Sequence, residues 1–178
     1  MTSSVNLVLA TDKKEGFFKS VPCYLVFTND EVVFAFLSKE RQKTENEEVR
    51  MRLKEEGKGF FKGTAALMSF WNTYGDRYYD ISKEDILKED GRNFSTTHGK
   101  IERFVFRGMR SNVDESQTES SGKIVILMNG EKIKLQHKYR DHNKKIKDIL
   151  KGLYSNRLKY SGQQGLTLTL GKNKDKIR

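Results

Sequence analysis

Three short runs near the start of the chain are rich in apolar residues, among them β-branched and aromatic ones. Residues 5–10 (VNLVLA) predict a short strand, and residues 22–28 (PCYLVFT) and 31–37 (EVVFAFL) predict two longer ones. Asn29 and Asp30 separate the longer runs, and both residue types favour tight turns. The two runs are therefore expected to form an antiparallel hairpin.

From residue 39 the pattern becomes helical. Residues 39–56 (KERQKTENEEVRMRLKEE) carry dense alternating charges that predict a solvated helix, which Gly57 and Gly59 end. Next come large apolar residues spaced three or four apart along one predicted helix face: Leu67, Phe70, Trp71, Tyr74 and Tyr78. Ser82, three residues before Asp85, predicts a short capped helix. Residues 39–90 thus read as a helical insertion between strands.

Strand patterns return at about residue 93. Residues 100–107 (KIERFVFR) predict one strand, and residues 111–121 (SNVDESQTESS) predict an acidic loop. Residues 122–128 (GKIVILM) and 131–137 (EKIKLQH) flank an Asn-Gly pair, and this arrangement predicts a hairpin with a type I′ turn.

The end of the chain combines an amphipathic helix with a basic tail. Asp141 is positioned to cap a helix whose apolar stripe contains Ile146, Ile149, Leu150, Leu153 and Tyr154. Residues 166–170 (LTLTL) alternate, so this tail segment either adds a strand to an exposed sheet edge or is disordered.

These elements predict one α+β domain over residues 1–155, followed by a basic tail over 156–178. The chain has 178 residues, which is somewhat short for two full domains. Its single cysteine, Cys23, lies in an apolar strand pattern and is expected to be a buried, reduced thiol.

Several local phrases resemble an uncharacterised group of bacterial proteins with a pleckstrin-homology-like (PH-like) domain. They are TNDEVVFAF, EEGKGFFKGTAALMSFWNTYGDRYYDISKEDIL, NFSTTHGKI and the closing hairpin with its helix, within about residues 5–155. One departure is Thr96-Thr97, where such sequences carry an Ile-Pro pair. The resemblance implies a bent antiparallel barrel or sandwich, capped by the last helix, with helices inserted after the early strands. It implies no known ligand, because such folds serve many binding roles.

The net charge of +10 is concentrated near the C-terminus. Residues 132–178 contain 14 Lys and Arg against 3 Asp and Glu, whereas the preceding part is nearly neutral. This distribution makes nonspecific nucleic-acid binding a candidate function. The candidate contacts are Lys138, Arg140, Lys144, Lys145, Lys147, Lys151, Arg157 and Lys159, and Tyr139, Tyr154 and Tyr160 offer stacking surfaces.

A second basic cluster is expected in the loop between the first two strands. The candidates for contact with an anionic surface are Lys13, Lys14, Phe17, Phe18 and Lys19. The resemblance implies that lipid-binding relatives also use basic residues on the second strand, but residues 22–27 (PCYLVF) contain none. The headgroup clamp is therefore incomplete. The sequence GFFK at residues 16–19, repeated at 59–62, either contacts a membrane or covers the core, and burial is favoured for such large apolar residues.

Enzyme signatures are missing from the sequence. His98, His137 and His142 are scattered without a common zinc-ligand spacing, and Cys23 has no neighbouring histidine to activate it. Gly171-Lys172 lacks the spacing of a phosphate-binding P-loop. We therefore expect no catalytic residue, metal or cofactor.

The sequence as a whole predicts a cytoplasmic, non-catalytic interaction module. The chain begins without a basic leader, and no apolar stretch reaches membrane-spanning length. A protein or peptide is the expected partner, docked between the last helix and a sheet edge; a nucleic acid and an anionic lipid surface are the alternatives. Self-association through the tail is a further expectation.

Overall fold

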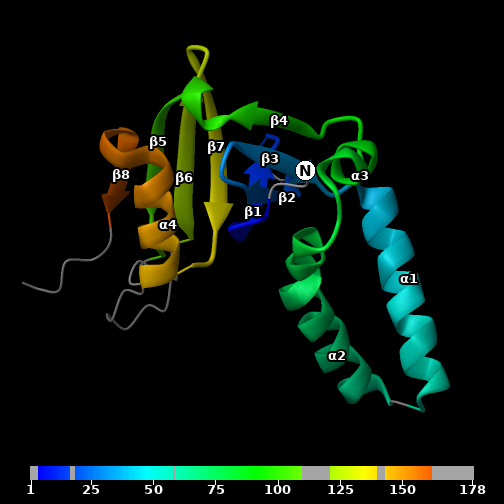
Figure 1. Ribbon diagram of the computed structural model, residues 1–178. Coiled ribbons are helices and arrows are strands. Elements are labelled where there is room, and N and C mark those ends of the chain that lie inside the picture. Colours follow the sequence, from blue (N-terminus) through cyan, green and yellow to red (C-terminus); the bar gives the residue numbers. More distant parts are fainter. Residues whose placement is uncertain (1–3, 17–18, 58, 110–120, 140–142, 162–178) are drawn as a thin grey trace, which may run out of the picture.

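The computed structural model describes residues 4–16, 19–57, 59–109, 121–139 and 143–161 (Figure 1). The fold is α+β, and these ranges contain one mixed sheet of eight strands and four α-helices. The strands are β1 (Leu7–Lys14), β2 (Ser20–Phe27), β3 (Glu31–Phe36), β4 (Phe94–Thr97), β5 (Ile101–Arg107), β6 (Gly122–Met128), β7 (Glu131–His137) and β8 (Leu158–Ser161). The helices are α1 (Lys39–Glu55), α2 (Phe60–Thr73), α3 (Lys83–Lys88) and α4 (Lys144–Tyr154). Three short 3₁₀ segments are η1 (Tyr74–Tyr79), η2 (His98–Lys100) and η3 (Ser155–Arg157).

The sheet has the strand order β4-β3-β2-β1-β7-β6-β5-β8. We call β1 to β4 the first half-sheet and β5 to β8 the second half-sheet. The two meet where β1 pairs with β7 over a short stretch, with Asp12 opposite Gln136 and Lys13 opposite Leu135. The expectation of a wholly antiparallel barrel needs correction, because β4 and β8 are free end strands and β8 runs parallel to β5. The physical reason is α4, which carries the chain back so that β8 runs in the same direction as β7.

Both predicted hairpins are confirmed. β2 pairs with β3 in antiparallel register, and β6 pairs with β7 across Asn129 and Gly130. The backbone φ angles of Asn129 and Gly130 are 51° and 76°, as a type I′ turn requires. The first strand extends further than its sequence pattern indicated, so Lys13 and Lys14 lie on β1 rather than in the following loop.

The helical insertion is partly docked on the sheet and partly extended from it. Helices α1 and α2 form a hairpin that extends away from the strands, whereas η1 and α3 lie against β1 and β3 (Figure 1). Ser38 caps α1, and Ser82 caps α3 by accepting a hydrogen bond from the Asp85 N–H at 3.2 Å, as the sequence predicted. The predicted aromatic stripe is packing surface, divided between α2 and η1: Trp71 donates to Asn46 of α1 at 2.9 Å, and Tyr74 and Tyr78 are buried.

The docked part of the insertion covers one face of the first half-sheet, which we call its outer face. There a second hydrophobic cluster joins the strand residues Tyr24, Val26 and Val33 to Tyr78 of η1 and Ile86 of α3. Because the other face of these strands lines the main core, β2 and β3 are buried on both sides.

Helix α4 covers the opposite, inner face of the sheet. Its apolar stripe places Ile146, Leu150 and Tyr154 in the main core, as predicted. The ring of Tyr154 stacks on Phe104 of β5, with centroids 4.8 Å apart. The side chain that caps this helix is Asn143, which accepts from the Ile146 N–H at 3.2 Å; the predicted cap, Asp141, lies outside the described residues.

A buried histidine ties α4 to both halves of the sheet. His98, between β4 and β5, has its Nδ1 atom 3.0 Å from the Tyr154 hydroxyl and its Nε2 atom 3.0 Å from the Thr28 carbonyl oxygen. Thr28 follows β2, so the imidazole joins the early hairpin, the chain between β4 and β5, and the end of α4.

His137, at the end of β7, is a second buried histidine. Its Nε2–H donates to the Arg107 carbonyl at 3.0 Å, and its Nδ1 accepts from the Tyr139 N–H at 3.0 Å, so the ring is neutral. Burial lowers its pKa to about 4. Gly122 of β6 passes so close that an added Cβ would lie 2.3 Å from a ring carbon of His137 and 2.8 Å from the Arg107 carbonyl oxygen.

Replacing Gly122 by Ala should therefore destabilise the fold, by about 1–3 kcal/mol in the free energy of unfolding. Urea unfolding is the measurement. The control is Gly152→Ala at an exposed position of helix α4, where no atom lies within 4 Å of the added methyl group. The control should be neutral or stabilising, since Ala is the better helix former. Equal stability of Gly122→Ala and the parent would contradict the close approach.

The depressed pKa of His137 predicts a pH dependence of stability. Between its ordinary pKa of 6.5 and the folded-state value of about 4, the unfolded chain binds a proton that the folded chain excludes. The contribution of His137 is therefore full above pH 6.5 and falls as the pH drops, by at most about 1.4 kcal/mol per pH unit. His137→Phe should be less stable than the parent at pH 7, and the difference should shrink at pH 5. A constant difference would show that His137 does not titrate in this way.

Candidate polyanion-binding surface

The outer face of the second half-sheet is built from every other residue of β5, β6 and β7. Phe104, Phe106, Ile124, Ile126 and Leu135 point inward and belong to the main core. The alternate positions must therefore point to the opposite face. In Figure 1 helix α4 lies on the core side of these strands, and no helix of the described chain covers the other side.

Cations surround the apolar centre of this face. Across β5, β6 and β7, one row of opposite residues is Arg103, Leu127 and Lys132, and the next is Val105, Val125 and Lys134. Further along, Arg107 of β5 lies opposite Lys123 of β6. On the other side of β5, Lys159 of β8 pairs with Val105. We define the basic face as six exposed cations: Arg103, Arg107, Lys123, Lys132, Lys134 and Lys159.

The cations of the basic face are not neutralised by neighbouring carboxylates. None of the six forms an ion pair with a described residue. The carboxylates closest in register lie at the margins: Glu102 and Glu131 near the β6–β7 turn, and Asp12 opposite Gln136. Glu102 accepts a hydrogen bond from the Gly130 N–H at 3.0 Å. Within the part of the chain that the structure describes, the basic face therefore presents cations that are not held in ion pairs.

The cations predicted from the C-terminal sequence do not form one surface. Lys144, Lys145, Lys147 and Lys151 are exposed on α4, which lies on the other side of the sheet from the basic face. The Lys147 ammonium lies 5.7 Å from the centroid of the Tyr160 ring. Only Lys159 belongs to the basic face.

Three further residues of that set have different environments. Arg157 Nη1 donates to the carbonyls of His98 at 2.8 Å and Ile101 at 2.7 Å, so part of this guanidinium is structural. Lys138 is exposed and follows β7. Burial raises the pKa of the nearby Asp12 carboxyl group, and the positive charge of Lys138 partly offsets this rise. Arg140 lies outside the described residues.

The lysines of the predicted cluster between β1 and β2 have different environments, and one of them, Lys19, is paired with a carboxylate. Lys19 pairs with Glu15 at 2.9 Å, and the Lys13 ammonium lies 5.4 Å from the centroid of the Phe36 ring. Lys14 is exposed at the end of β1, and Phe17 and Phe18 lie outside the described residues.

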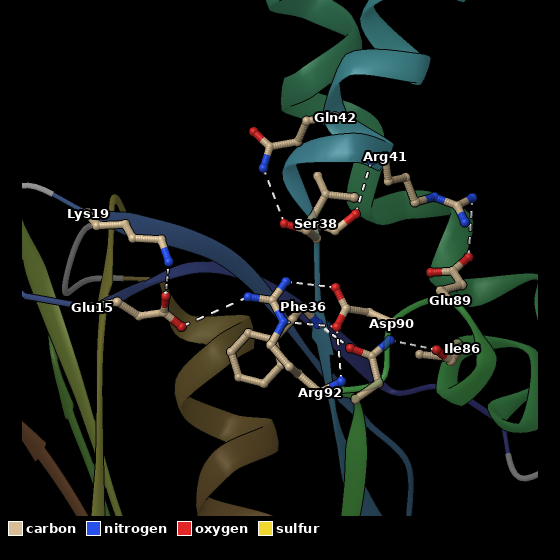
Figure 2. Close-up of polar contacts among 12 residues, drawn as sticks. Glu15, Lys19, Phe36, Ser38, Arg41, Gln42, Ile86, Glu89, Asp90 and Arg92 are labelled. Atoms are coloured by element: carbon tan, nitrogen blue, oxygen red, sulfur yellow. Dashed lines mark hydrogen bonds and ion pairs between the residues drawn. The ribbon is translucent and has the colours of Figure 1, made fainter.

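Arg92 occupies the centre of this region, between the carboxylates of Asp90 and Glu15 (Figure 2). Its Nε and Nη2 atoms donate to Asp90 at 2.9 and 2.7 Å, and these hydrogen bonds lower the pKa of that carboxyl group. Asn93 beside it accepts from the Phe36 N–H at 2.7 Å and donates to the Ile86 carbonyl at 2.7 Å. These contacts join the β1–β2 turn to the segment after α3 and pair the Arg92 guanidinium with two carboxylates.

Three further features concern metal-ligating and nucleophilic groups and the hollows among the described residues. No group of three or more His, Cys, Asp or Glu there is placed to hold a metal ion. Cys23 is buried, as predicted, and burial raises the pKa of its thiol to about 12. A hollow of about 760 Å³ lies beside η1 and α3, and its one lining cation among the described residues, Lys83, is paired with Glu31 at 2.7 Å.

Five members of the basic face were missed by sequence reasoning, namely Arg103, Arg107, Lys123, Lys132 and Lys134. They lie on three strands and do not form a charge run. The sequence does show lysines at positions 123, 132 and 134 that alternate with apolar residues, as on the exposed face of a strand. The strand register is needed to show that these lysines lie on one surface.

Comparison with known proteins gives no family for this chain. No protein-family model, curated protein or solved structure matches it. Within the described residues no helix combines the length and apolar character needed to cross a bilayer.

Mutual repulsion on the basic face predicts an effect on stability. Lys132→Gln with Lys134→Gln should raise the free energy of unfolding by about 0.5 kcal/mol at low salt, because neighbouring like charges repel. The gain should disappear at high salt, where the Debye length is about 3 Å at 1 M. The measurement is thermal unfolding at two salt concentrations. Lys83→Gln, which removes the ion pair with Glu31, is the control and should not be stabilising. Destabilisation by the double substitution would indicate that these lysines have acidic partners.

Proposed function

We propose that this protein is a non-catalytic, cytoplasmic interaction module that binds the phosphate backbone of nucleic acid through the basic face. The single observation that carries the proposal is a set of six exposed cations that form no ion pair with the described residues, on a sheet face that no described helix covers. Such a surface binds polyanions by releasing their counterions.

The spacing of the cations suits a dense row of phosphates. Lys132 and Lys134 are two residues apart on one strand, or roughly 7 Å, and Arg103 and Arg107 are roughly 13 Å apart. Duplex DNA carries one negative charge per about 1.7 Å of axis, so the basic face spans several phosphates at once.

The apolar centre of the basic face favours backbone contact over base stacking. Val105, Val125 and Leu127 are partly or fully buried among their neighbours, and no aromatic side chain lies on the basic face as defined by its strand register. Stacking platforms for single strands use aromatic rings, and membrane-inserting surfaces use protruding apolar ones. A duplex bound without base readout is therefore the preferred partner.

The peptide partner expected from the sequence meets an obstacle at the sheet edge beside α4. There β8 already pairs with β5, with Leu158 opposite Phe104 and Tyr160 opposite Phe106. A peptide would have to displace β8 or add to its outer edge. Self-association through residues 166–170 concerns a segment outside the described residues.

A PH-like scaffold is part of the proposal. Its support is the order of the elements: the antiparallel strands β1 to β4 are followed by the antiparallel strands β5 to β7, and helix α4 then packs on the inner face of both groups. The resemblance of the sequence phrases given above points to the same scaffold.

Binding should fall steeply with salt, and the basic face should set the slope. We expect the logarithm of the affinity for a labelled DNA duplex to fall against the logarithm of salt concentration with a slope of about −0.9 per phosphate contact. Fluorescence anisotropy at several salt concentrations measures it. Lys132→Gln with Lys134→Gln should reduce the magnitude of the slope by about 2.

The matched control is Lys144→Gln with Lys145→Gln, which removes the same charge from α4. It should leave the slope nearly unchanged. Equal effects of the two pairs would contradict a role specific to the basic face. Binding to anionic vesicles, with no binding to the duplex, would replace nucleic acid by a membrane surface.

A further inference from the structure

A hollow of about 350 Å³ adjoins the basic face where α4 leads into β8. Its lining residues are Glu102, Arg103, Asn156, Arg157, Leu158 and Lys159. Arg103 and Lys159 belong to the basic face, so the hollow is continuous with that surface. Three of the lining residues are cationic and one is acidic.

Arg157 is held in place independently of any ligand. Both of its donated hydrogen bonds, to the His98 and Ile101 carbonyls, come from Nη1, and its guanidinium lies 5.9 Å from the centroid of the Tyr154 ring. A guanidinium has five N–H donors. Those on Nε and Nη2 meet no acceptor among the described residues. Because the side chain is already ordered, binding an anion there loses less side-chain entropy.

The backbone that presents Asn156 and Arg157 is constrained. Ser155, which ends α4, has φ 45° and ψ −117°, a conformation that non-glycine residues rarely adopt. This turn directs the chain from α4 into η3 and then along β5 as β8. Arg157 and Lys159 are thereby brought beside Arg103, which is more than fifty positions earlier in the sequence.

The charge of the hollow matches that of a phosphomonoester. Arg103, Arg157 and Lys159 supply three positive charges, while Glu102, which accepts the Gly130 N–H, supplies one negative charge. The balance of two positive charges complements a phosphomonoester, whose charge is about −1.5 to −2 at pH 7. A phosphodiester carries a single charge and lacks the third terminal oxygen, so it matches the hollow less well.

We propose that this hollow binds the terminal phosphate of a nucleic-acid strand that lies on the basic face. The inference rests on the proposed function for the source of the phosphate, although the hollow itself is defined by its own residues. Arg157 supplies fixed donors, and Arg103 and Lys159 close over the phosphate from β5 and β8.

The test compares two duplexes of one sequence, with 5′-phosphate or 5′-hydroxyl ends, at constant ionic strength. The parent protein should bind the phosphorylated duplex about tenfold more tightly, as one or two additional charge-assisted hydrogen bonds would give. Lys159→Gln and, separately, Arg103→Gln should remove most of this preference. The matched control, Lys132→Gln, should weaken binding of both duplexes equally and keep the preference.

Arg157→Lys tests the fixed guanidinium, with unfolding measured alongside because Arg157 also holds two backbone carbonyls. A folded Arg157→Lys protein that keeps the full preference would overturn the role of Arg157. Equal affinity of the parent for both duplexes would overturn the terminal-phosphate site and leave the proposed function standing.

A titration with inorganic phosphate, followed by the backbone amide NMR signals of Arg157 to Lys159, separates the remaining cases. Saturable shifts that Lys159→Gln weakens support the hollow as a phosphate site. If such shifts occur but neither duplex binds, the proposed function and the nucleic-acid source both fail. If the parent prefers the phosphorylated duplex but these amides do not shift, the phosphate binds elsewhere and the inference is wrong.

Discussion

The packing of Tyr154 at the end of α4 is the contact on which the arrangement of the rest depends. Its ring stacks on Phe104 of β5, and its hydroxyl lies 3.0 Å from Nδ1 of His98, whose other nitrogen lies 3.0 Å from the Thr28 carbonyl. Each partner belongs to a different part of the chain. A buried hydroxyl and a buried imidazole would be costly without partners, so the three parts are held in one relative position.

Once α4 occupies the inner face, the two outer faces have different environments. On the first half-sheet, η1 and α3 cover the outer face through Tyr24, Val26 and Val33. Gly75 of η1 permits this close approach, because a Cβ there would lie 3.0 Å from the Tyr24 ring. On the second half-sheet six of the alternate positions are lysine or arginine, which are costly to bury without acidic partners. The outer side of the sheet is thus covered by the insertion on the first half-sheet and carries exposed cations on the second.

The same division explains where the positive charge is free to act. In the region around Arg92, the side chains of Lys19 and Arg92 are paired with the carboxylates of Glu15 and Asp90, and such surface pairs contribute modest stability. On the basic face the like charges lie close together and repel one another. An anionic partner would relieve this repulsion, which is why we propose a binding role for this surface. At the edge of the same surface, hydrogen bonds to two backbone carbonyls hold the guanidinium of Arg157 in place.

Local patterns in the sequence determined the elements, and tertiary structure decided what they form together. The 2-residue and 3.6-residue periods, the Asn129-Gly130 turn and the Ser82 cap depend on neighbours within a few positions, so both hairpins, the helices and the buried Cys23 were predictable. The extension of β1 through Lys14 was not predictable in this way, because β2 supplies its partners and the residues there are polar. The parallel strand β8 was missed for the same reason, since its short sequence becomes a strand only beside β5. The basic face depends on register: Arg103, Lys132 and Lys159 meet because backbone hydrogen bonds align strands that are distant in sequence, and the composition of a single strand does not encode that alignment.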